Sequence, residues 1–490
     1  MTSTLPLREA SGANRRSIRI VRASAMLIIE ARLAMSQDTL QRSRGERAWA
    51  SPREHLPSVR AHLDAPTEIA SLAALRALFG LVMCGAAVRF LAKGWVSELL
   101  VAPGFHFRYA AFEFAKPLPI LWMTALYVVL ALAALCVAVG FCYRVCAVVV
   151  FLGFTYVELI DKAIYLNHYY LVSLLAGLLI LLPAGRAYSL DSLLNPRLAV
   201  TTVPRWVLSA LRLQVGVVYF FAGVAKLNAD WLFHAQPLRI WLSARADWPL
   251  LGGLLTTPAV AYVASWFGAA FDLSIVFLLL APRTRSFAFA VLVAFHILTG
   301  VLFPIGIFPW LMTALATIFL APDWPLAFWA RVRARTPSHG TPHAWRAPRW
   351  LAPLLLLHCT AQLLIPLRRF LEPSDSAWTQ QGFNFGWNVM VAEKAGQVAF
   401  RVRDRRSGAE ESVAPSTWLA RFQEVAMAQD PEMVRQAALF LAERYRARGR
   451  DVAVFADAVA SLNGRPSRAL IDPTVDLSRP LPASWLLPLD

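Results

Sequence analysis

The sequence predicts a mainly α-helical membrane protein, in which a polytopic bundle of about nine apolar segments precedes a smaller α+β extracytoplasmic domain. Three observations support this fold class. Hydrophobic residues make up 57% of the 490 residues and the mean hydropathy is +0.50, above the roughly 45–50% apolar content of average soluble proteins. Long apolar runs separated by short polar links occupy 66–367, as in a multi-pass transmembrane domain. Residues 368–490 are polar and carry the patterns of a folded soluble domain.

The N-terminal residues 1–65 are rich in arginine and contain no lysine. They hold no apolar run of secretory length, since the run that begins at Met26 is short. We expect a disordered basic cytoplasmic tail. The alternative is an upstream extension in front of a true start at Met26 or Met35.

The apolar segments that follow are each near the ~20 residues that a helix needs to cross a bilayer. The last two before the polar link at 322–349 are separated only by Phe303-Pro304, so they could form a tight or re-entrant hairpin. The nine predicted segments lie at 69–92, 118–140, 144–160, 169–184, 205–226, 258–281, 286–302, 305–321 and 350–367.

The distribution of arginine predicts the topology. With the N-terminus inside, the inner loops hold Arg144, then the arginines of 186–205, 283–285 and 331–349, whereas the cations of the outer loops are mostly offset by acids. Nine crossings then place residues after about Pro366 outside. The net charge of +17 is thus explained by membrane topology, and we expect no nucleic-acid partner. The arginine bias suggests a bacterial inner membrane.

The polar region at 368–490 contains recognisable element patterns. Residues 398–404 alternate as in a strand, and 406–408 read as a turn. Residues 416–449 carry helical periodicity, and the proline-punctuated end from Asp472 onward is extended. All five cysteines lie in or beside apolar segments, so we expect neither a structural disulfide nor a metal site.

Lys226, at the end of the segment 205–226, is the first candidate for chemistry. The chain has only five lysines against 43 arginines (48 basic residues less five). A buried lysine can lose its proton and act as a base, whereas arginine stays charged; the alternative is an interfacial cation that snorkels to the headgroups. The predicted topology puts Asn167, His168 and His296 in the same half of the membrane.

Two further charges lie deep in the bundle. Asp272 lies 14 residues into its segment from Pro258, or roughly 21 Å. Arg212 lies 14 residues before Lys226 on the neighbouring segment, at a similar depth. We therefore predict a structural Arg212–Asp272 ion pair, because an unpaired charge there is costly. A direct pair between Asp272 and Lys226 is predicted to be too long.

Several stretches resemble the vitamin K-dependent gamma-glutamyl carboxylase family, of the HTTM type, in the same order along residues 65–490. The first is Ala-Gly-Val-Ala-Lys226-Leu-Asn-Ala-Asp-Trp231, which is similar to the lysine motif of the family. The others are Asp161-Lys162 with Asn167-His168-Tyr-Tyr-Leu171, Phe271-Asp-Leu-Ser274, Phe295-His296 with Leu302-Phe-Pro-Ile-Gly-Ile-Phe308, Ala321-Pro-Asp-Trp-Pro325, Trp378-Thr through Phe385-Gly-Trp387-Asn-Val-Met-Val391, and Ile471-Asp-Pro-Thr-Val-Asp476.

The resemblance implies an enzyme that oxygenates reduced vitamin K, a naphthoquinol, to its epoxide, and that could couple this to carboxylation of peptide glutamate with O2 and CO2 as co-substrates. Lys226 would be the base, and His168 would orient the quinone or stabilise its oxyanion. The implied substrate-binding residues also include Asn167, His296 and Trp387.

Two residues on the helix face of Lys226 add to this site: Tyr219 and Gly223 lie seven and three residues before it. Gly223 would leave room for a flat ring, although small residues also simply pack membrane helices.

The chain departs from the family pattern in the stretch linked to glutamate binding. Phe383 stands where the family has tyrosine, Asn388 where it has aspartate, and Ala392 where it has histidine. The resemblance therefore supports oxygenation of the quinol more directly than it supports carboxylation of glutamate. The alternative function is a membrane scaffold or lipid-binding protein that keeps the fold without the chemistry. A transporter is disfavoured, because no matching pair of interrupted half-segments is present.

Overall fold

The computed structural model describes residues 59–333, 344–372, 374–482 and 484–489. The compact unit described below begins at Val59. Most of the predicted tail 1–65 lies outside the described residues; its last part forms the short helix α2, Val59–Asp64.

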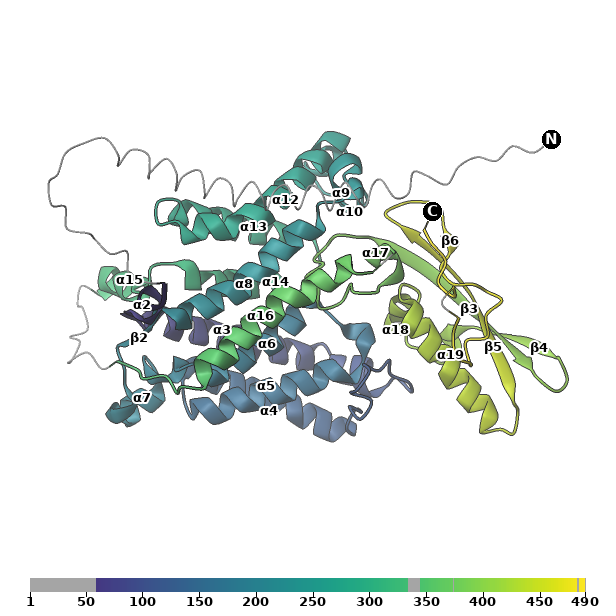
Figure 1. The fold of residues 1–490 in the computed structure, drawn as a ribbon, viewed down its shortest axis with the longest axis horizontal. Coiled ribbons are helices and arrows are strands. Elements are labelled where there is room, and N and C mark those ends of the chain that lie inside the picture. Colours follow the sequence, from purple (N-terminus) through teal and green to yellow (C-terminus); the bar gives the residue numbers. More distant parts are fainter. Residues whose placement is uncertain (1–58, 334–343, 373, 483, 490) are drawn as a thin grey trace, which may run out of the picture. The chain divides into compact units, whose positions relative to one another are not determined.

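The bundle is built from helices that are long and apolar enough to cross a bilayer, together with two shorter apolar helices (Figure 1). The long helices within the described residues are α3 (Ala70–Ala92), α4 (Ile120–Val139), α5 (Tyr143–Ile160), α8 (Arg205–Ala225), α12 (Pro258–Leu280), α13 (Arg285–Leu302) and α16 with the 3-10 turn η7 (Leu351–Leu364 and Ile365–Phe370). The shorter ones are α6 (Asn167–Leu181) and α14 with η6 (Phe308–Ala316 and Thr317–Phe319). Together they occupy the nine predicted segments, so the predicted mainly α-helical membrane bundle is confirmed.

Glycine residues allow the backbones of neighbouring helices in the bundle to pack closely. A Cβ on Gly80 of α3 would lie 2.5 Å from the backbone nitrogen of Ala138 on α4, a distance that no larger residue tolerates. Helix α8 contacts α6, α12 and α16 and buries side chains along almost its whole length. A membrane helix buried on most sides is one on which a polar side chain meets protein instead of lipid.

Short elements connect these helices. Strands β1 (Pro66–Glu68) and β2 (Thr202–Pro204) pair in an antiparallel ladder at the start of α3 and α8. The remaining short elements are η2 (Val96–Val101), η3 (Lys162–Ile164), η4 (Ala184–Arg186), α7 (Leu190–Leu194), η5 (Pro196–Leu198), α9 (Ala229–His234), α10 (Leu238–Ser243), α11 (Gly252–Leu255), α15 (Trp324–Arg333), α17 (Ser376–Thr379) and η8 (Pro415–Thr417).

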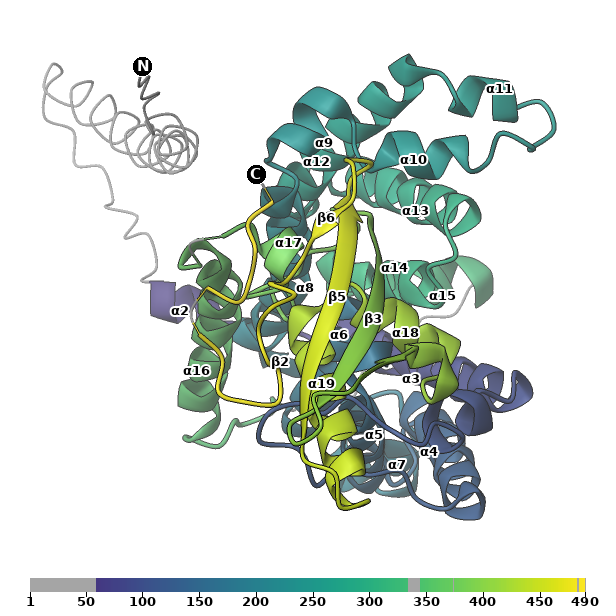
Figure 2. The same cartoon turned by 90° about the vertical axis from the view of Figure 1, so that its right-hand side faces the viewer.

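The C-terminal domain is an antiparallel sheet in the order β4-β3-β5-β6, with α18 (Arg421–Met427) and α19 (Pro431–Arg446) against it. Figure 2 shows β3 and β5 side by side as its two long strands. The strands are β3 (Lys394–Asp404), β4 (Glu410–Val413), β5 (Val452–Leu462) and β6 (Arg468–Ala469). The predicted strand at 398–404 and its turn are confirmed, whereas the sequence interpretation overlooked β5.

The predicted helical stretch at 416–449 is interrupted. Asp430 caps α19 by accepting hydrogen bonds from the backbone N–H groups of Glu432 and Met433, and Pro431 occupies the first turn. Proline cannot continue a preceding helix but suits a first helical turn. The stretch therefore forms two helices with a sharp break between them.

Polar contacts join the C-terminal domain to the links between membrane helices. Lys162 Nζ lies 2.6 Å from a carboxylate oxygen of Asp430, and Gln423 donates to the Asp161 carboxylate over 2.6 Å. The third such contact is an ion pair of 2.6 Å between Arg465 and Asp230. These contacts fix the residues after α5 and α8 against the domain that follows the bundle.

Candidate functional site

Lys226 stands at the C-terminal end of α8, where it caps the helix. Its backbone N–H donates to Gly223 O over 3.0 Å, which closes the last turn. A lysine at a helix C-terminus is favoured by the negative end of the helix dipole. The side chain is only 7% exposed, so it is held inside the protein and does not extend freely to an interface.

Three acceptors surround the amine of Lys226. Its Nζ donates to Asp272 Oδ2 over 2.8 Å, to Val389 O over 3.1 Å and to Ala222 O over 3.3 Å. The ring of Trp231 lies 5.1 Å from the same nitrogen. An ammonium group has three N–H donors and no acceptor. In the described arrangement each N–H of the ammonium form therefore has a hydrogen-bond acceptor. One of these acceptors, the Asp272 carboxylate, could take a proton from it.

The predicted Arg212–Asp272 pair is wrong, because the structure pairs Asp272 with Lys226 instead. Arg212 donates from Nε to Ile318 O over 2.9 Å and from Nη2 to Leu320 O. These carbonyls close η6, so the guanidinium satisfies a helix end.

The depth argument failed because α12 starts well beyond the level of Lys226. Trp231 Nε1 donates to Ser265 O over 2.7 Å, so the first turns of α12 lie beside α9, past the end of α8. A Cβ on Gly223 would lie 2.8 Å from the backbone nitrogen of Leu273. Asp272 is thus level with the last turn of α8, within reach of a lysine side chain.

Gly223 serves this packing. The atoms that an added Cβ would meet all belong to Leu273 on α12, and Gly223 is absent from the lining of the cavity beside Lys226. The expectation that Gly223 leaves room for a flat ring is therefore not what the geometry shows. Its small size lets α8 approach α12 and brings Lys226 to Asp272.

A cavity of about 130 Å³ borders Lys226 and Asp272. Helices α8, α9, α10, α12, α13 and α14 supply its walls, together with Val389 and Met390. Most of the lining is apolar or aromatic, including Phe295, Phe303 and Phe308. An apolar cavity of roughly 150 Å³ is known to hold benzene, so this space suits about one aromatic ring.

The lining of the cavity carries a second polar pair. Tyr219 and His296 both line the cavity, and the tyrosine hydroxyl lies 2.7 Å from His296 Nε2. His296 is 1% exposed, and its Nδ1 is buried without a hydrogen-bond partner among the described residues. A buried polar atom without a partner is costly, so Nδ1 is a candidate contact for a ligand. The sequence interpretation named both residues.

His168 lies behind the cavity wall. Its ring centre is 5.7 Å from that of Phe308, and the ring of His296 is 5.8 Å from the same phenylalanine. Phe308 lines the cavity, whereas His168 does not belong to its lining. The aromatic ring of Phe308 thus contacts both histidines, and His168 is one residue removed from the cavity lining.

Asn167 and Trp387 support a loop instead of lining the cavity. Asn167 donates from Nδ2 to Asn388 O over 3.1 Å, and Trp387 is fully buried with its ring stacked 5.1 Å from that of Tyr170. Neither belongs to the lining of the cavity. Both residues hold the segment 380–391, which we call the bridging loop.

The bridging loop is strained and well anchored. Four non-glycine residues have positive φ, namely Gln380 (62°), Phe385 (61°), Trp387 (57°) and Met390 (50°). Such conformations cost of order 1–3 kcal/mol each and persist where the surroundings impose them. Tyr165 accepts from the Phe385 backbone N–H over 2.8 Å. The loop thereby presents the Val389 carbonyl to Lys226, a contact that no side-chain pattern in the sequence could reveal.

Two parts of the chain match known families. Residues 65–324 match the HTTM domain, and residues 347–490 match the vitamin K-dependent gamma-carboxylase, lumenal domain. The first match includes Lys226, Asp272 and His296, and the second includes the bridging loop. No solved structure matches the chain significantly.

Proposed function

The chain belongs to the vitamin K-dependent gamma-carboxylase family, and on that basis we propose that it oxidises a reduced naphthoquinone to its epoxide at the membrane, with Lys226 as the base. The observation that carries this proposal is the mainly apolar cavity in which a buried lysine faces a buried carboxylate. Ionisable groups inside a membrane bundle are costly and are functional candidates by default.

The quinol would lie with its ring in the cavity and its oxygens toward the two polar pairs. Lys226 and Asp272 line one side, and Tyr219 and His296 line another. A bound reduced naphthoquinone would be the molecule that reacts with O2 to form the epoxide. The cavity of about 130 Å³ matches about one aromatic ring, so the second fused ring of the naphthoquinol and its hydrocarbon tail would extend from the site between helices.

Lys226 must be neutral to accept a proton. Its charged form donates to Asp272 over 2.8 Å, and movement of that proton to the carboxylate leaves an amine beside a neutral carboxyl group. In a low-dielectric site the neutral pair competes with the ion pair, because burial penalises charge. The amine can then take the phenolic proton of the quinol, and the pair gains one proton as the quinol loses it.

Tyr219, His296 and His168 have distinct proposed roles. The free Nδ1 of His296 would contact a quinol oxygen, and the Tyr219 hydroxyl would fix the orientation of the imidazole. His168 would act after displacement of Phe308, whose ring it contacts. Asn167 and Trp387 would act through the bridging loop, which they support.

Carboxylation of peptide glutamate with CO2 is the second half of the proposed reaction. Asn388 is 3% exposed and bonds internally, accepting from Arg369 and donating to Phe383 O over 2.6 Å. These internal contacts leave Asn388 unavailable to a peptide in the described conformation. Oxygenation of the quinol is therefore the half that the geometry supports better.

The test is epoxide formation from vitamin K hydroquinone and O2 by the purified protein in lipid nanodiscs. Lys226→Ala should abolish the epoxide, because no other amine borders the cavity among its described lining residues. Lys93→Ala is a matched control, since Lys93 also caps a membrane helix but is exposed. Equal epoxide yields from the wild type and Lys226→Ala would refute the role of Lys226.

A non-catalytic scaffold or lipid-binding protein is the second candidate. It is favoured by the full internal hydrogen bonding of Lys226 and by the position of His168 outside the cavity lining. Absence of epoxide from the wild type, in protein that binds the quinol, would support this candidate over the enzyme.

A further inference from the structure

A second and larger hollow lies on another side of the bridging loop. This groove has a volume of about 820 Å³, against about 130 Å³ for the cavity beside Lys226. Helices α5 and α6 form its floor, α16 forms one wall, and the segment at 109–112 and Phe385 cover one end. None of the residues proposed above to contact the quinol lines it.

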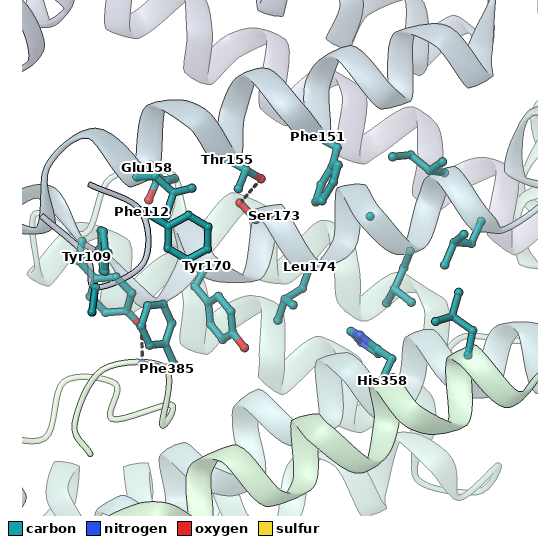
Figure 3. Close-up of a pocket in the computed structure, with 18 residues that line it drawn as sticks. Tyr109, Phe112, Phe151, Thr155, Glu158, Tyr170, Ser173, Leu174, His358 and Phe385 are labelled. Atoms are coloured by element: carbon teal, nitrogen blue, oxygen red, sulfur yellow. Dashed lines mark hydrogen bonds between the residues drawn. The ribbon is translucent and has the colours of Figure 1, made fainter. Parts of the chain in front are cut away.

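One end of the groove carries Glu158 and Tyr109, and the rest is mainly apolar, with His358 on the wall that α16 forms. Figure 3 shows Tyr109, Glu158 and Phe385 gathered at one end, with Leu174 farther along. The lining of α6 extends from Tyr170 to Leu181, which is eleven residues or roughly 16 Å along the helix axis. This shape suits a molecule with a small polar head and a long hydrocarbon tail.

Among the described residues that line the groove, Glu158 is the one that carries a carboxyl group. It lies on the membrane helix α5, and within the described part of the chain no ion pair or hydrogen bond to it is found. Arg89 lines a small cavity on the other side of Glu158 but forms no ion pair with it among the described residues. A carboxyl group without a protein partner inside a membrane bundle points to a ligand that donates a hydrogen bond.

Aromatic rings surround this end of the groove. The ring of Phe385 lies 4.9 Å from that of Tyr170, 5.0 Å from Tyr165 and 6.1 Å from Tyr109. Burial raises the pKa of the Tyr109 phenol, and the neighbouring Glu158 raises it further, so this hydroxyl stays neutral. Ring edges and faces at these distances favour a flat aromatic head over a bulky phosphate head.

We propose that the groove binds a second quinol, with its ring between Phe385 and Tyr109, a hydroxyl that donates to Glu158, and a hydrocarbon tail along α6 toward Leu181. The chemical identity of this ligand rests on the proposed function, whereas the groove itself does not. The site is separate from the Lys226 cavity, and the bridging loop joins the two: Phe385 lines the groove, and Val389 and Met390 line the cavity. The groove would hold the whole long-tailed molecule. The Lys226 cavity nearby has room for only part of its ring system.

The test counts bound quinone by native mass spectrometry of the full chain in detergent. The probe is a naphthoquinol with an isoprenoid tail, kept reduced, and it should bind the wild type at two sites. Leu354→Trp should remove one of them, since Leu354 lines the groove from α16 and is 39% exposed. Leu356→Trp is the matched control, because Leu356 is exposed on the same helix and does not line the groove; it should retain both.

Two further variants separate the sites. Leu298→Trp would fill the Lys226 cavity, which Leu298 lines, and should leave the groove-bound molecule in place. Glu158→Leu should weaken the groove site about tenfold, as expected when the acceptor is lost and the ligand hydroxyl is left without a hydrogen-bond partner. Binding of a naphthoquinol without a tail should be the same in the wild type and in Leu354→Trp.

Either of two results would overturn the second site. One is a quinone count that Leu354→Trp leaves unchanged. The other is a co-purified phospholipid that Leu354→Trp removes while the quinone count stays at one. A different result would count against the proposed function alone. In it, Leu298→Trp loses the quinone bound in the Lys226 cavity, but the wild type forms no epoxide.

Discussion

Two buried lysines, Lys226 in the bundle and Lys394 in the C-terminal domain, share several features. Their exposed fractions are 5% and 6%. Each amine lies 5.1 Å from the ring of a tryptophan, Trp231 for the first and Trp378 for the second. Only the surroundings of the two amines distinguish them.

Lys394 begins β3 and donates to backbone carbonyls, those of Trp378 and Gln429. No cavity described above includes it in its lining. Lys226 instead bonds a carboxylate and borders a cavity. The comparison shows that burial is common to structural and functional lysines, whereas a proton acceptor and space for a ligand are what permit chemistry.

The largest expected difference between the two lysines is in catalysis. Lys226→Met should lower the rate of epoxide formation by about 10²- to 10⁴-fold, the usual contribution of a general base. Lys394→Met should leave the rate unchanged, because Lys394 contacts no ligand space. Single-turnover epoxide yield measures both. A similar fall in folded Lys394→Met would break the distinction.

The carboxylate partner predicts the next effect, on stability. Asp272→Ala leaves the Lys226 amine buried without its ion pair, which should destabilise the protein by about 3–5 kcal/mol. Adding Lys226→Met should recover most of this loss, because no unpaired charge remains. Thermal unfolding of the single and double variants tests the coupling. Additive losses would mean that the pair contributes nothing as a pair.

The burial of Lys394 should make the stability of the protein depend on pH. Burial lowers its pKa to about 8, against about 10.4 in an unfolded chain. Between these values the unfolded chain holds more protons than the folded one, so stability rises with pH. The gain is roughly 3 kcal/mol over the whole window. Unfolding of the wild type and Lys394→Met from pH 7.5 to 10 should show this rise only in the wild type.

The smallest expected effect concerns the helix packing that joins Lys226 to Asp272. Gly223→Ala would force a Cβ to 2.8 Å from the Leu273 backbone and should cost about 1–3 kcal/mol. Gly85→Ala on α3 has nothing within 4 Å of its Cβ and serves as the control. Unfolding temperatures of the two variants measure the difference, and equal values would show that α8 and α12 separate freely.

The sequence predicts the elements of this protein better than it predicts their register. Apolar length located the membrane segments, and alternation located β3, because each signal is local. The Arg212–Asp272 pairing failed because it assumed that α12 begins level with the end of α8, whereas α9 packs beside its first turns. Composition, topology and the resemblance indicated Lys226 and His296, and helix-face spacing indicated Tyr219. It could not indicate the Val389 carbonyl, since a backbone contact leaves no mark on residue types.

One acceptor of the Lys226 amine comes from the bridging loop, beyond the last membrane helix. The two family matches therefore do not correspond to two self-sufficient modules. A chain cut between them would give a membrane half whose lysine lacks one acceptor and whose cavity lacks the cover of Val389 and Met390. Gene splitting or domain exchange in this protein should thus keep the loop together with the membrane bundle.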